Sequence, residues 1–91
     1  MAKTIFTRPY KILIDRLLAE RQKAGITQKE LALRLNKPQS HISKCENGER
    51  RLDVVELIQI AGALNIDLIP LIRQIQDAVD DELTVMQTKE S

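Results

Sequence analysis

Aromatic residues are nearly absent from this chain of 91 residues, which has one Phe, one Tyr and no Trp. Aromatic side chains therefore cannot dominate the core, and the 43% of residues that are hydrophobic must pack mainly through Leu and Ile. A chain of this length forms one small domain with a single core.

Cysteine is equally scarce. The single residue, Cys45, excludes an internal disulfide and is typical of a reducing compartment. One Cys and one His cannot form a conventional metal site. The sequence contains no apolar run of about 18 residues, so we expect no membrane span. Its first residues do not have the pattern of a secretory leader. We therefore expect a cytoplasmic protein that needs no cofactor.

The net charge of +1 conceals two halves of opposite sign. Residues 1–51 contain twelve Lys or Arg and five Asp or Glu, a net charge of +7. Residues 52–91 contain two Lys or Arg and eight Asp or Glu, a net charge of −6. A chain polarised in this way favours an acidic partner for its basic half.

Apolar residues at helical spacing predict two helices in the first part of the chain. The first spans about 9–23, begins at Pro9 and stops before Gly25. The second spans about 28–35, and "TQKE" predicts a capping box between Thr27 and Glu30 at its start.

Three further helices follow. Pro38 opens the third and Asn47-Gly48 closes it, while Asp53 and Asp67 are predicted to cap the fourth and fifth. After residue 82 the apolar pattern weakens, which predicts a loose tail. The expected organisation is an N-terminal arm at 1–8, an all-α five-helix domain at 9–82 and a tail at 83–91.

The second and third helices have the features of a helix-turn-helix. Ala32 supplies the small residue where the two helices cross, and Asn36 tolerates the positive φ of the turn. Ile42 and Cys45 fall on one face of the third helix and are predicted to point inward.

The opposite face of the third helix is polar and free to enter a major groove. The side chains predicted there are Gln39, Ser40, Ser43 and Lys44. Gln can pair with adenine through two hydrogen bonds, Lys can donate to guanine, and Ser can bond to either base. We predict that these residues read DNA bases.

The segment from Ile12 to Ile72 resembles the phage repressor and Cro-like (XRE) helix-turn-helix family, most specifically in "TQKELA", "SHIS" and "ENGERRLDVVELIQIAGAL". The resemblance implies a compact five-helix bundle, operator DNA as ligand and a two-fold dimer. It also implies that Gln28 begins the second helix near a phosphate and braces Gln39. The residues expected along the DNA backbone are Gln28, Thr27, Lys29, Lys37, His41, Asn47, Arg50 and Arg51.

The turn departs from the family pattern. Asn36 stands where the family commonly has Gly, Lys37 where it has an apolar residue, and Pro38 where it has a Ser or Thr cap. Lys37 is therefore expected to point toward phosphate. Cys45 replaces a larger aliphatic residue, so slacker packing is expected beneath the third helix.

Several alternatives stay open. The polar residues of the third helix could be merely solvated, Cys45 could be a redox sensor, and Arg50 and Arg51 could pair with Glu46 or Glu49. No catalytic triple suggests itself, so we expect no enzyme. The main hypothesis is that the protein is a transcription regulator, and specifically a repressor. It is expected to bind a palindromic operator as a homodimer. The alternatives are an antitoxin that also covers a toxin protein, and an interaction module that has lost DNA binding.

Overall fold

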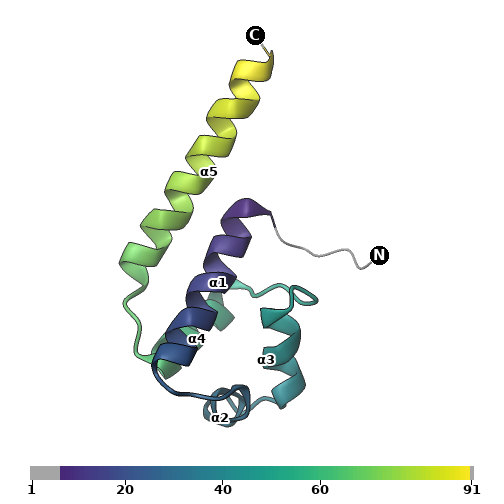
Figure 1. Ribbon diagram of the computed structural model, residues 1–91, viewed down its shortest axis with the longest axis vertical. Helices are drawn as coiled ribbons and strands as arrows, with labels where there is room; N and C mark the ends of the chain where they lie inside the picture. The colour runs from purple at the N-terminus through teal and green to yellow at the C-terminus, as the bar shows by residue number, and fades with distance from the viewer. Residues whose placement is uncertain (1–6, 91) are drawn as a thin grey trace.

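Five α-helices make up the regular structure of residues 7–90, the part of the chain that the computed structural model describes, and no strand occurs there (Figure 1). Side chains are described for residues 7–85. The helices are α1 (Arg8–Lys23), α2 (Gln28–Arg34), α3 (Gln39–Glu46), α4 (Val54–Leu64) and α5 (Leu68–Glu90). The predicted all-α, five-helix fold is confirmed. No described helix is both long and apolar enough to cross a membrane.

Side-chain caps begin α2 and α4, at the residues that the sequence predicts. The Thr27 hydroxyl accepts the Glu30 N–H at 3.1 Å, but the Glu30 carboxylate pairs with Arg34 at 3.0 Å, so the structure shows only the threonine half of the predicted box. A complete capping box forms at α4, where Asp53 accepts the Glu56 N–H at 2.7 Å and Glu56 accepts the Asp53 N–H at 3.0 Å. Glu56 thereby gains a fixed position at the start of α4.

The turn between α2 and α3 has the geometry predicted for it. Asn36 adopts a left-handed conformation with φ of 56°. The N–H of Lys37 reaches back to the Ala32 carbonyl at 2.9 Å, which closes α2 with a Schellman-type bond. Pro38 precedes α3 without a side-chain cap. The turn therefore keeps its shape although it lacks the usual Gly and Ser.

The core is aliphatic and lies between α1, the α2–α3 pair, α4 and the first half of α5. Ala32 is buried on α2, which packs against α3, as the helix-turn-helix prediction requires. Leu71 of α5 is fully buried, and the cluster around it comprises Leu13, Leu17, Ile26, Leu31, Ile42, Leu57, Ile60 and Leu64.

The C-terminal segment corrects the sequence prediction. Helix α5 does not loosen after residue 82 but continues to Glu90, so the predicted tail is helical. Residues 71–90 contain neither Pro nor Gly, and Val79 and Leu83 continue the helical apolar spacing. Figure 1 shows α5 lying along α1 and then projecting beyond its N-terminal end. Most of the predicted arm, residues 1–6, lies outside the described residues.

Candidate nucleic-acid interface

Helix α3 has an apolar side and a polar side. Ile42 and Cys45 are buried, as predicted, whereas Gln39, Ser40 and Lys44 are exposed and Ser43 is partly exposed. Among the residues whose side chains the structure describes, none of these four side chains forms a hydrogen bond or an ion pair with another residue. The polar face of α3, meaning Gln39, Ser40, Ser43 and Lys44, is thus available to a ligand.

A buried ion pair fixes the C-terminal end of α3. The guanidinium of Arg21 on α1 donates to both carboxylate oxygens of Glu46, at 2.7 and 3.1 Å. Its remaining nitrogen donates to the Ile26 carbonyl at 2.8 Å. Only 11% of the Arg21 side chain and 13% of the Glu46 side chain are exposed. A charge pair with little exposure, in which every guanidinium nitrogen donates a hydrogen bond, holds two helices in one orientation.

Gln28 corrects a detail of the family expectation. It does begin α2, but its side-chain amide donates to Glu46 at 2.8 Å and does not brace Gln39. A hydrogen bond to a carboxylate is stronger than one between two neutral amides, which explains the choice of partner. Gln28 therefore joins the start of α2 to the end of α3 through the same carboxylate that binds Arg21.

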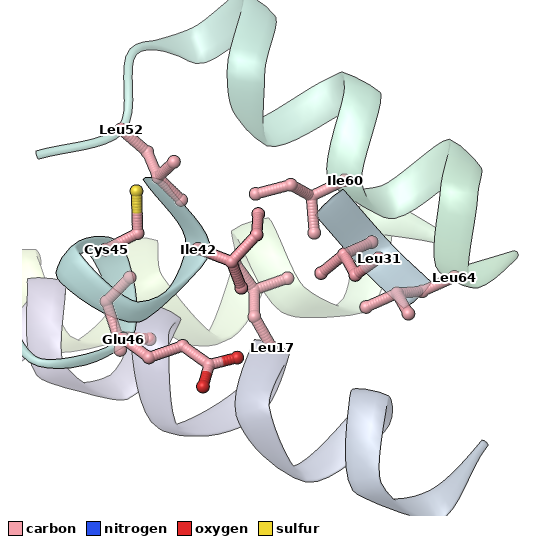
Figure 2. A pocket seen from close by; sticks show the side chains of 9 residues that line it. Leu17, Leu31, Ile42, Cys45, Glu46, Leu52, Ile60 and Leu64 are labelled. Atoms are coloured by element: carbon pink, nitrogen blue, oxygen red, sulfur yellow. The ribbon is translucent and has the colours of Figure 1, made fainter. Parts of the chain in front are cut away.

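A small cavity of about 20 Å³ lies beneath α3. Figure 2 shows Cys45, Ile42 and Leu52 around it, with Ile60, Leu31 and Leu64 further along the lining. This void agrees with the slack packing expected beside Cys45. Burial raises the pKa of the Cys45 thiol, which keeps it protonated and unreactive, so its position favours packing over redox sensing.

The loop after α3, residues 47–53, is held from two sides. Its backbone folds onto the end of α3, because the N–H groups of Glu49 and Arg50 both donate to the Lys44 carbonyl, at 2.9 and 3.2 Å. From α1, the Tyr10 hydroxyl accepts the Leu52 N–H at 2.8 Å. The Arg51 guanidinium lies 4.6 Å from the centre of the Tyr10 ring, a cation–π contact.

Arg50 pairs with neither of the two acids considered from the sequence. Its guanidinium lies 2.8 Å from the Glu56 carboxylate at the start of α4, and it also donates to the Arg51 carbonyl at 3.2 Å. The hydrogen bond to Glu56 raises the pKa of Arg50. The loop is thereby tied to α4 as well as to α1.

His41 faces the same carboxylate. Its Nε2 lies 3.4 Å from Glu56, and only 14% of its side chain is exposed. Burial, followed by the charge of Arg50, lowers the pKa of His41 from its ordinary value of 6.5; Glu56 opposes this effect and Lys37 adds to it. The imidazole is therefore neutral at pH 7. This geometry favours a role in joining α3 to α4 over the phosphate contact predicted for it.

The other predicted backbone residues are exposed around the polar face of α3. They lie at the start of α2, in the turn and in the following loop, and are Thr27, Lys29, Lys37, Asn47, Arg50 and Arg51. The exposure of Lys37 agrees with its expected direction away from the core. The contacts of these residues with DNA stay predictions.

The sequence prediction missed the residues that position the site: Arg21, Glu46, Glu56 and Tyr10. Two of them carry a detectable signal. Arg21 continues the inward stripe of Ile14 and Leu17, and Glu46 stands four residues after Ile42. A charge on an apolar stripe requires a partner, and these two charges have opposite signs.

Comparison with known proteins assigns the class. A family model described as helix-turn-helix matches residues 17–71, more than half of the chain, so this is a helix-turn-helix protein of the DNA-binding type. A solved structure of an XRE-family like protein from Pseudomonas syringae pv. tomato str. DC3000 is similar, with 47% identity over 77% of this chain and 85% of that chain and a TM-score of 0.72. No match was found among curated proteins.

The chain therefore belongs to the XRE family of helix-turn-helix proteins, as the sequence resemblance predicts. This family consists of DNA-binding transcription regulators and is generally non-enzymatic.

Proposed function

We propose that the protein is a repressor that binds a palindromic operator as a homodimer, with α3 in the major groove. The observation that carries the proposal is the polar face of α3, whose four side chains have no partner among the described residues, while the end of the same helix is bound to α1 and α2. Rigid support and unpaired donors and acceptors are what base readout requires. Its place of action would be the cytoplasm, at the nucleoid.

Within this proposal, Gln39, Ser40, Ser43 and Lys44 read bases. Phosphates would be contacted from the start of α2, the turn and the loop, by Thr27, Gln28, Lys29, Lys37, Asn47, Arg50 and Arg51. Because Arg50 already pairs with Glu56 and Arg51 already lies on Tyr10, these two cations are held in place before DNA arrives. Such preorganisation lowers the entropy cost of binding.

Salt dependence of duplex binding tests the proposal. Each neutralised phosphate contributes about −0.9 to the slope of log K against log salt. Arg51→Ala should weaken binding to specific and random duplexes alike and flatten this slope by about one unit. Arg16→Ala is the matched control, since Arg16 pairs with Glu20 at 3.4 Å within α1. Binding that is indifferent to salt would refute a basic DNA-facing surface.

A further inference from the structure

Three ionisable side chains meet at one carboxylate oxygen beside α3. The Oε2 atom of Glu56 lies 2.8 Å from Nη1 of Arg50 and 3.4 Å from Nε2 of His41. The other oxygen of this carboxylate, Oε1, accepts the Asp53 N–H at 3.0 Å in the capping box. An arginine from the loop and a histidine from α3 therefore share a single acceptor on α4.

Arg50 can keep this carboxylate and still bind an anion. Its contacts with Glu56, with the Arg51 carbonyl at 3.2 Å and with the Cys45 sulfur at 4.0 Å all use Nη1. The side chain is 42% exposed, and a guanidinium can donate from each of its nitrogens. A phosphate bound to the other nitrogens would offset the charge of Arg50 without breaking its bond to Glu56.

Both cations that act on His41 are also proposed phosphate contacts. The charged groups that face His41 are Glu56 from α4, Arg50 from the loop and Lys37 from the turn. In the free protein, burial and then the charge of Arg50 lower the pKa of His41. Glu56 raises this pKa and Lys37 lowers it, each by a smaller amount. DNA phosphates would offset both cations, so that the Glu56 carboxylate would dominate the electrostatics at His41.

We propose that Glu56 is a positioning residue that couples DNA binding to a proton: when a phosphate binds Arg50, His41 takes up a proton from solvent and forms an ion pair with Glu56. This pair ties α3 to α4 by charge only while DNA is bound. The inference rests on the proposed function, since it needs a phosphate beside Arg50. Because the bound state holds more protons than the free state, affinity for the duplex rises as the pH falls.

The test is the affinity of the full chain for a duplex selected from random sequences, at about pH 7.5 and pH 6 and one salt concentration. The chain has one histidine, so no other side chain with an ordinary pKa titrates in this range. Wild-type affinity should rise at least about fourfold at the lower pH, whereas His41→Gln and Glu56→Gln should change by less than about 1.5-fold. Gln also completes a capping box, so Glu56→Gln removes the charge and keeps the start of α4.

Glu49→Gln is the matched control. Glu49 is exposed in the same loop but is not among the charges that face His41, so this variant should keep the wild-type rise in affinity. Calorimetric titration in two buffers with different heats of ionisation counts the protons directly. Wild type and Glu49→Gln should take up a fraction of a proton on binding, and the other two variants none. Circular dichroism at both pH values checks that each protein stays folded.

Two results would overturn the inference. One is a wild-type affinity that does not change with pH. The other is a Glu56→Gln variant that keeps the wild-type rise, which would show that DNA acts on His41 without the carboxylate. Binding that depends on salt but not on pH would refute this inference alone and leave the proposed function standing. Absence of duplex binding at every pH would refute both.

Discussion

The two sides of α3 differ in whether their polar side chains have hydrogen-bond partners. This difference separates the residues proposed to read DNA bases from those that hold the helix in position. On the polar side, Gln39, Ser40 and Lys44 are exposed and have no defined partner among the described residues. On the other side and at its C-terminal end, Glu46 alone accepts three hydrogen bonds, from Arg21 and Gln28. The four side chains proposed to read bases are thus left unpaired, whereas Arg21 and Glu46 hold the helix that carries them in place.

Removing the carboxylate that holds the C-terminal end of α3 should have the largest effect on stability. Glu46→Ala leaves the Arg21 guanidinium buried without a counter-charge, so we expect the free energy of unfolding to fall by about 2–4 kcal/mol. Glu30→Ala is the control, because it removes an exposed pair with Arg34 and should cost at most about 1 kcal/mol. Urea denaturation at pH 7 measures both. Equal losses would show that the buried pair does not support α3.

Filling the cavity beneath α3 should increase the stability of the fold. Cys45→Val adds volume to the void of about 20 Å³ beneath α3, and cavity filling of this kind stabilises by about 0.5–1 kcal/mol. The polar face of α3 is unchanged, so DNA affinity should stay within about twofold. Thermal unfolding and duplex titration provide the two readouts. A destabilised variant would mean that the lining cannot move to accept the extra methyl group.

Low pH should destabilise the packing of α3 against α4 through His41, and this is the smallest of the three expected changes in stability. The pKa of His41 is lower in the folded chain than its ordinary value of 6.5, so the unfolded chain binds more protons as the pH falls. The contribution of neutral His41 to stability is therefore complete above about pH 6.5 and is lost as the pH drops below it. Urea midpoints between about pH 7.5 and 5.5 should fall less steeply for His41→Gln than for wild type. If the urea midpoints of the two proteins fall equally with pH, His41 does not cause the acid dependence of stability.

Local signals predicted the fold well. Thr27, Asp53 and Asp67 cap the helices they precede, and Asn36 turns the chain with positive φ, because each acts on its own few neighbours. The prediction of a loose tail was wrong. A weaker apolar pattern does not end a helix by itself, and residues 83–90 contain no Pro or Gly that would end it.

The support of the site was harder to predict, since it depends on residues far apart in the chain. Arg21 meets Glu46 across 25 positions and Tyr10 meets Leu52 across 42. No local rule chose Glu56 over Glu46 or Glu49 as the partner of Arg50, because that choice follows from how α4 packs beside the loop. The exposed face, in contrast, follows from helical period alone, as the burial of Ile42 and Cys45 confirms.

The division between reading and support is tested most directly by operator selection from random duplexes, with wild type and Gln39→Ala compared at one salt concentration. Gln39 opens α3, the end that points at base edges in this motif. The account predicts an inverted repeat with one adenine per half-site that depends on Gln39. The variant should lose about 1–3 kcal/mol on that site and its preference at that position alone, with unfolding unchanged. Gln74→Ala, an exposed glutamine on α5, should select the wild-type sequence. An unchanged consensus for Gln39→Ala, with binding weaker on every duplex, would contradict the assignment of base reading to the polar face of α3.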